Sequence, residues 1–294
     1  NHVAAMLLME RNWGSEVFTP PAYYSLTALG KALFAVPEGA GENRQEMPES
    51  LPYEQILDAM EQEADVRRRE RAAMLTSNAV ISISGPITES LTSRYGSHRR
   101  LLTIPNGVNP PDAGASDPQW ISSLGLKPRR YVVAVGRLVP EKGLHTLIET
   151  APALREAGLR IVVAGGADHP TAYSAALTRL AAESGVVMTG TVDRSRINAL
   201  LADAALFVMP SLHEGLPIAL LEAMSHSLDV AVSDIESCRL PQLAPADFFP
   251  PGDAAALTAL ILDKTARHAR RTYNLADYDW DRIAAAVLDL YHSL

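Results

Sequence analysis

Short apolar runs alternate with amphipathic stretches from about residue 131 to the end of the chain. Strands are predicted where apolar residues follow one another without a break, and helices where they recur at helical spacing. The predicted strands are 131–135, 160–164, 186–188, 205–209 and 230–232, and the predicted helices are 143–157, 173–184, 194–201 and 217–226. Continuously apolar strands that alternate with helices are typical of a parallel sheet covered on both faces. We therefore expect an α/β fold with a Rossmann-like, doubly wound sheet.

The first half of the chain is less regular. Helices are predicted at 2–11, 53–74 and 86–95, strands at 16–19, 79–84 and 101–104, and a linker rich in Pro, Gly and Asn at 105–117. Two or three βα units are too few for a complete doubly wound domain. We expect residues 1–110 to form a partial, truncated N-terminal Rossmann-like domain, 111–275 a second such domain, and 276–294 a terminal helix that packs back on the first.

Composition narrows the classes of protein. The 294 residues carry 26 Lys and Arg against 34 Asp and Glu, a formal net charge of −8, which argues against a dedicated nucleic-acid binder. The single cysteine, Cys238, cannot form an internal disulfide and has no base beside it, which predicts an inert thiol and a cytoplasmic location. The basic clusters 67–71 and 267–271 are expected to be solvated helix faces, with peripheral contact to anionic lipid headgroups as the alternative.

Two cations follow the predicted strand 131–135, in the stretch that runs from Gly136 and Arg137 to Lys142 and Gly143. This loop lies at the carboxyl edge of the predicted sheet, where ligands bind in open α/β folds. The planar fork of Arg137 and the point charge of Lys142 suit the two phosphates of a nucleoside diphosphate. The alternative is a surface loop with two solvated cations.

Two glutamates eight residues apart mark a second candidate site, with Glu214 in a loop and Glu222 on the predicted helix 217–226. Gly215 allows a ligand to approach the backbone, and Pro217 is predicted as the first helical residue. The free N–H groups of the first helical turn form an anion site. The alternative is an ordinary acidic residue before a helix together with a solvated glutamate on it.

Taken together, these two stretches resemble the retaining glycosyltransferases of family 4. The family's Glu-x7-Glu element matches Glu214 and Glu222, and its G-R-x-x-x-x-K-G element matches Gly136, Arg137, Lys142 and Gly143. The stretch at 190–192, the linker entry at 104–108 and the aromatic pair Tyr278 and Trp280 also match. The resemblance implies the GT-B fold, in which two Rossmann-like domains face a cleft.

The resemblance also implies a role for each matched residue. Arg137 and Lys142 would bind the donor diphosphate and stabilise the leaving group, Glu214 would bind the donor sugar, and Glu222 would bind the ribose hydroxyls. The remaining donor-binding positions are Gly136 in the G-R-x-x-x-x-K-G element, Thr191 and Val192 near the base, and Gly215, Leu216 and Pro217 at the helix N-terminus. The donor would be a UDP, GDP or ADP sugar, with no metal and no cofactor, and the acceptor a sugar, a lipid or a small molecule.

Departures from the family pattern leave other interpretations of the function open. Asp229 opens a buried strand, where we expect it to cap the strand or face solvent, and Ile235–Arg239 replaces the usual stretch near the donor sugar. The leading hypothesis is a retaining transferase. The alternatives are a non-catalytic or truncated remnant that binds nucleotide sugars, and, less favoured, a sugar-nucleotide epimerase or phosphorylase-like enzyme.

Overall fold

The computed structural model describes residues 53–111, 114 and 116–294. The helix predicted at 2–11 and the strand predicted at 16–19 lie outside the described residues. The described chain divides into two compact units. Unit 1 comprises the described residues up to Ile83 together with Ile87–Thr103 and Leu294, and unit 2 comprises Ser84–Pro86 and Ile104–Ser293.

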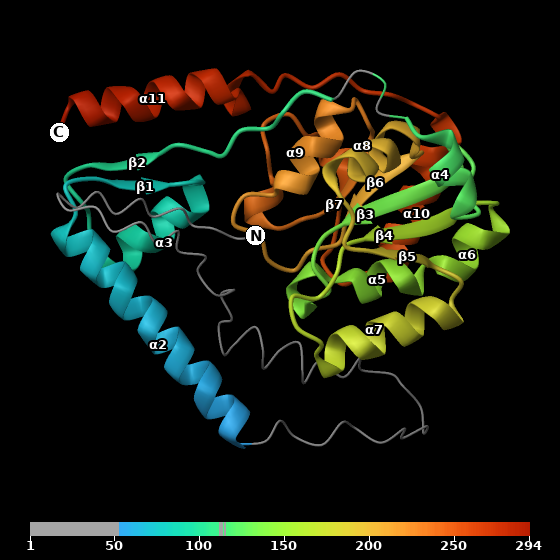
Figure 1. The fold of residues 1–294 in the computed structure, drawn as a ribbon, viewed down its shortest axis with the longest axis horizontal. Coiled ribbons are helices and arrows are strands. Elements are labelled where there is room, and N and C mark those ends of the chain that lie inside the picture. Colours follow the sequence, from blue (N-terminus) through green and yellow to red (C-terminus); the bar gives the residue numbers. More distant parts are fainter. Residues whose placement is uncertain (1–52, 112–113, 115) are drawn as a thin grey trace. The chain divides into compact units, whose positions relative to one another are not determined.

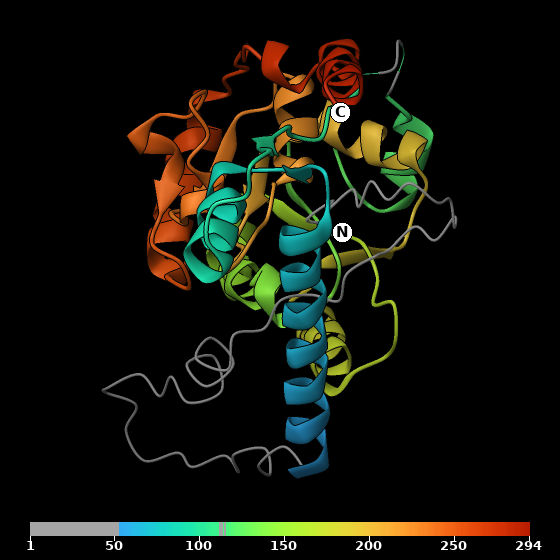
Figure 2. The ribbon, with the colours of Figure 1, turned by 90° about the vertical axis from the view of Figure 1, so that its left-hand side faces the viewer.

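Unit 1 contains one parallel βαβ unit preceded by a long helix. Its elements are α2 (Tyr53–Thr76), β1 (Val80–Ser82), α3 (Gly85–Tyr95) and β2 (Leu101–Thr103), and α2 is seen along its whole length in Figure 2. Strands β1 and β2 pair in parallel, with Val80 opposite Leu101. Met74, Val80 and Leu91 form a small apolar core between these elements. The two helices and two strands predicted for this stretch are confirmed.

Unit 2 is built on a six-stranded parallel sheet with the strand order β5-β4-β3-β6-β7-β8. The strands are β3 (Tyr131–Val135), β4 (Arg160–Ala164), β5 (Val187–Gly190), β6 (Leu206–Met209), β7 (Val230–Ser233) and β8 (Phe248–Phe249). The five predicted strands are confirmed. The sequence does not reveal β8, because two phenylalanines are too short a run to show a strand pattern.

Helices cover both faces of this sheet, as Figure 1 shows. One face carries α8 (Arg194–Asp203) and α9 (Ile218–Ser225), and the other carries α5 (Leu144–Glu149), α6 (Ala151–Glu156), α7 (Ala172–Glu183) and α10 (Ala254–Arg267). The central strands are therefore fully buried, with Val132 and Val162 both 0% exposed. The short α4 (Pro118–Ser123) and the terminal α11 (Trp280–His292) complete the unit. No helix in the described part of the chain has the length and apolar character needed to cross a membrane.

Two predicted helices begin or continue differently from the prediction. The single helix expected at 143–157 is a 3-10 turn at Pro140–Lys142 followed by α5 and α6, with the break at Thr150. Pro152 lacks the N–H that would continue the hydrogen-bond ladder, which explains the break. The helix expected at 217–226 begins at Ile218, and Pro217 precedes it as the cap residue rather than as the first helical residue.

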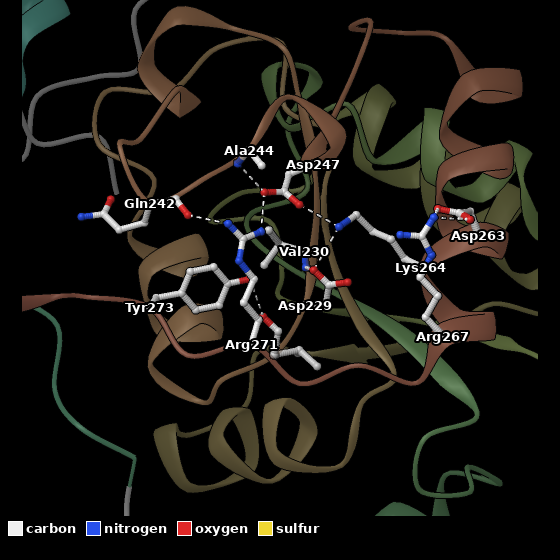
Figure 3. Close-up of polar contacts among 11 residues, drawn as sticks. Asp229, Val230, Gln242, Ala244, Asp247, Asp263, Lys264, Arg267, Arg271 and Tyr273 are labelled. Carbon is white, nitrogen blue, oxygen red and sulfur yellow. Dashed lines mark hydrogen bonds and ion pairs between the residues drawn. The ribbon is translucent and has the colours of Figure 1, made fainter.

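A network of four buried or half-buried charges joins α10 to the amino ends of β7 and β8 (Figure 3). Lys264 Nζ lies 3.0 Å from Asp229 Oδ1 and 2.7 Å from Asp247 Oδ1. Arg271 donates to Asp247 Oδ2 at 2.6 Å and to the Gln242 carbonyl at 2.7 Å. The prediction that Asp229 caps its strand or faces solvent is therefore half right, because its carboxylate accepts the N–H of Val230 but is buried against Lys264.

The network is charge-balanced, with two carboxylates and two cations, as buried charges must be. Burial would raise the pKa of the Asp247 carboxyl, but hydrogen bonds from Lys264, the Ala244 N–H and Arg271 hold that pKa below its usual value. A carboxyl whose pKa falls on folding stabilises the folded state above its unfolded pKa, and the stabilisation is lost as the pH falls through the folded value.

Replacing Asp247 with Ala should lower the free energy of unfolding by about 3–5 kcal/mol at pH 7, because Arg271 and Lys264 lose a buried partner. Urea denaturation at pH 7 measures this, and the difference from wild type should shrink below about pH 4 as the wild-type carboxyl is protonated. The matched control is Asp263→Ala, which breaks an exposed ion pair between two residues of α10, Asp263 and Arg267. It should change the free energy of unfolding by under about 1 kcal/mol. Equal effects of the two substitutions would contradict the role of the network.

Candidate functional site

The loops that leave the carboxyl ends of β3, β4, β5 and β6 are joined to one another by backbone hydrogen bonds. The Gly136 N–H donates to the Ala164 carbonyl at 3.0 Å, and the Gly165 N–H donates to the Gly190 carbonyl at 2.9 Å. The Leu212 N–H donates to the Glu141 carbonyl at 2.8 Å. The four loops therefore form one continuous surface at the edge where ligands bind in this class of fold.

Glycines allow these loops to approach so closely. Gly143 has a φ of 58°, and a Cβ atom there would lie 2.0 Å from the Pro210 carbonyl oxygen. A Cβ atom on Gly165 would lie 1.9 Å from the Gly136 oxygen. Side chains at these two positions would push the β3 loop away from its neighbours.

A buried ion pair connects the two stretches singled out in the sequence. Lys142 Nζ lies 2.7 Å from Glu214 Oε1, and the Ser211 hydroxyl lies 2.6 Å from the same oxygen. The side chains are 11% and 2% exposed, respectively. A buried pair with an added hydrogen bond fixes both side chains, so the β3 loop and the β6 loop meet at one charged point.

Arg137 lies in the same loop and is held between two carboxylates. Its guanidinium is 3.2 Å from Asp168 Oδ2 and 3.7 Å from Glu141 Oε1, and 24% of its side chain is exposed. Arg137 is thus more accessible to a ligand than Lys142. Asp168 is itself 69% exposed, so its contact is easily exchanged for a more highly charged anion.

Glu222 lies on α9, and its cationic partner is a different residue from that of Glu214. Its carboxylate binds Arg194 of α8 at 3.0 Å, and its side chain is 19% exposed. Burial raises the pKa of the Glu222 carboxyl above its ordinary value, and Arg194 opposes that rise. Glu222 is therefore half-buried and paired, which contradicts the alternative interpretation of a solvated glutamate.

Glu222 and Arg194 line a pocket of about 280 Å³ within unit 2. Its remaining walls are Asn106, Gly107, Val108, Asn109, Ile218 and Trp280. The Trp280 ring packs on Gly107, where a Cβ atom would lie only 2.5 Å from it. The sequence pointed to the linker and to Trp280 by family resemblance, but it gave no signal for Arg194 or Ile218.

The other predicted donor-binding residues lie in the same group of loops. Gly215, Leu216 and Pro217 are buried at the N-terminus of α9, and the Pro217 carbonyl accepts from the Leu220 and Leu221 N–H groups. Thr191 is exposed and Val192 half-buried in the loop after β5. Because Thr191 Oγ1 would lie 2.5 Å from a Cβ atom on Gly166, the β5 loop also packs on the β4 loop.

Two other chemical features concern this region. Cys238 is fully buried, its sulfur lies 3.9 Å from that of Met209, and burial raises the pKa of its thiol, in agreement with an inert role. Within the described residues, no group of three or more His, Cys, Asp and Glu side chains is arranged to hold a metal ion.

Comparison with known proteins shows which family this part of the chain resembles. Residues 129–267, which carry both charged stretches, match the model of the family described as glycosyl transferases group 1. These residues are therefore similar to a group 1 glycosyltransferase domain, and the α/β architecture with parallel sheets is that of the GT-B glycosyltransferases.

Individual relatives are similar over a longer part of the chain. The chain is 30% identical to the alpha-maltose-1-phosphate synthase of Mycobacterium tuberculosis over 76% of its own length and 65% of that protein. It is 29% identical to a GDP-mannose:cellobiosyl-diphosphopolyprenol alpha-mannosyltransferase of Komagataeibacter xylinus, over 68% of this chain and 53% of that one. The solved structure of Anabaena Alr3699/HepE in complex with UDP and glucose is similar with a TM-score of 0.68 at 20% identity, over 79% of this chain and 67% of that one.

The close approach of the β3 loop to Pro210 can be tested by substituting glycines. Gly143→Ala should be destabilising by clearly more than the roughly 1–2 kcal/mol that a left-handed φ costs a side chain, because the Cβ atom also meets a carbonyl oxygen. Gly158→Ala is the matched control, since Gly158 has a φ of 73° and nothing within 4 Å of the added atom. Thermal or urea unfolding of both variants measures the difference, and equal destabilisation would contradict the constraint.

Proposed function

We propose that the protein is a retaining glycosyltransferase that moves a sugar from a nucleoside diphosphate sugar to an acceptor without a metal ion. The observation that carries the proposal is the buried contact between Lys142 and Glu214. This contact joins a cationic loop to a helix N-terminus, and together they offer positive charge to one anionic ligand.

The diphosphate of the donor would bind to Arg137, Lys142 and the N-terminus of α9. When the bond between sugar and phosphate breaks, negative charge develops on the leaving diphosphate. Cations and N–H groups that are already in place stabilise this charge without having to reorganise, which is the largest contribution in many enzymes. In this role they would take the place of a metal ion.

The two glutamates would hold the two ends of the donor. Glu214, anchored by Lys142 and Ser211, would bind the sugar, and Glu222 would bind the ribose, with Thr191 and Val192 beside the base. We do not assign them as the acid and nucleophile of a glycosidase, because each is engaged by its own cation. The anomeric configuration of the sugar would be retained, because the phosphate would leave and the acceptor would attack on the same face of the sugar.

The names of similar proteins indicate which nucleotides to test as part of the donor. The Komagataeibacter enzyme is named for GDP-mannose, and the Anabaena protein was solved with UDP and glucose. The nucleotide proposed here is therefore UDP or GDP, with ADP as the third candidate, and the acceptor is a sugar, a lipid-linked sugar or a small molecule.

Titration calorimetry with UDP, GDP and ADP tests the donor site. One nucleotide should bind, and Lys142→Ala should weaken that binding by roughly 10- to 100-fold, since a hydrogen bond to a charged group contributes about 1.5–3 kcal/mol. Arg137→Ala should act in the same direction, and it leaves the buried Glu214 paired. Lys127→Ala removes an exposed lysine elsewhere in unit 2 and is the matched control.

Failure of all three nucleotides to bind the folded protein would contradict the proposal. Tight binding without any turnover of UDP-glucose, GDP-mannose or ADP-glucose, with acceptor sugars present, would instead favour a non-catalytic protein that binds nucleotide sugars.

Turnover itself tests the stereochemistry and the role of metal. Proton NMR of the first product formed should show the same anomeric configuration as the donor, and an inverted product would contradict the retaining mechanism. The rate should be unchanged within error after dialysis against EDTA, because Arg137, Lys142 and the helix N-terminus carry the charge.

A further inference from the structure

The contact between Arg194 and Glu222 bridges two helices that come from different βα units. Arg194 is the first residue of α8, directly after the loop that carries Thr191 and Val192, and Glu222 lies in the middle of α9. Both line the pocket of about 280 Å³. Arg194 therefore connects the loop proposed for the base to Glu222, the carboxylate proposed for the ribose.

A second polar contact joins the same two helices, one helical turn after the contact between Arg194 and Glu222. His226 Nε2 lies 3.3 Å from Asn198 Oδ1, and Asn198 is 5% exposed. Residues four apart lie on the same face of a helix, so 194 and 198 face 222 and 226 as two successive contacts. Loss of the Arg194 side chain would leave α8 and α9 joined by Asn198 and His226.

Arg194 acts on a carboxylate that burial has made harder to ionise. The Glu222 side chain is 19% exposed, and among the described residues Arg194 supplies its side-chain hydrogen bond, at Oε1. An ionised carboxylate accepts on both oxygens, whereas a protonated one also has to donate. A neighbouring guanidinium keeps the charge on the carboxylate and fixes its plane.

We infer that Arg194 is a positioning residue, which holds Glu222 ionised and oriented in the pocket so that the carboxylate can accept hydrogen bonds from the ribose hydroxyls of the donor nucleotide. This inference rests on the proposed function. Arg194 would act through Glu222 and would not contact the diphosphate.

The exposure of the pair makes this role separable from a structural one. The Arg194 side chain is 51% exposed, and ion pairs as exposed as that contribute little to folding. Substitution of Arg194 should therefore leave the unfolding midpoint close to that of wild type. Its effect should appear in the discrimination between ligands with and without ribose hydroxyls.

The experiment measures Kd for the nucleoside diphosphate that binds wild type, for its 2′-deoxy and 2′,3′-dideoxy analogues, and for inorganic pyrophosphate. Wild type should lose affinity at each removal of a hydroxyl. Arg194→Gln should bind the ribonucleotide about tenfold more weakly, should lose most of the discrimination against the analogues, and should bind pyrophosphate as wild type does. Glu222→Gln should show the same pattern, and Arg194→Lys should restore most of the discrimination.

Arg196→Gln is the matched control, two residues along α8, where the guanidinium lies over the Trp120 ring and away from the pocket. Full discrimination in Arg194→Gln would overturn the inference and leave the proposed function intact. An equal loss of pyrophosphate affinity would also overturn it, because Arg194 would then bind phosphate directly. Absence of nucleotide binding in wild type would overturn the proposed function, and the inference with it.

Discussion

Parallel strand pairing is the constraint on which the rest of unit 2 depends. Because all six strands run in one direction, every loop that follows a strand emerges at the same edge. Residues as distant in sequence as Lys142 and Glu214 can then share a 2.7 Å contact without any long excursion of the chain. The Gly136–Ala164 and Gly165–Gly190 hydrogen bonds continue the sheet into the loops, so main-chain contacts join the candidate site to the core.

The two edges of the sheet carry different electrostatic arrangements. At the amino edge, Lys264 and Arg271 are matched by Asp229 and Asp247, and this network anchors the segment that returns from β7 to begin β8. At the carboxyl edge, Lys142 is paired with Glu214, but Arg137 is partly exposed and the helix N-terminus of α9 adds further positive potential. The first arrangement suits stability and the second suits an anionic ligand.

Much of the fold could be predicted because its causes are local in the sequence. Apolar runs gave the five longer strands of unit 2, and the loop glycines marked the edge of the sheet. The pairing of Asp229 with Lys264 and of Arg194 with Glu222 could not be predicted, since each pair is about 30 residues apart and depends on how helices lie on the sheet. The break at Thr150 was predictable in principle from Pro152, but the apolar periodicity continues through it.

The pairing of each glutamate with its own cation decides how the Glu-x7-Glu spacing should be understood. Seven residues separate Glu214 from Glu222, yet Glu214 is paired with Lys142 of the β3 loop and Glu222 with Arg194 of α8, so the spacing does not bring the two carboxylates together. The 2%-exposed carboxylate of Glu214 keeps Lys142 fixed, so under the proposed function a phosphate would meet a lysine that has little conformational entropy left to lose. The side chains of the candidate site are thus fixed by their own contacts, and the carboxyl edge of the sheet supplies that organisation.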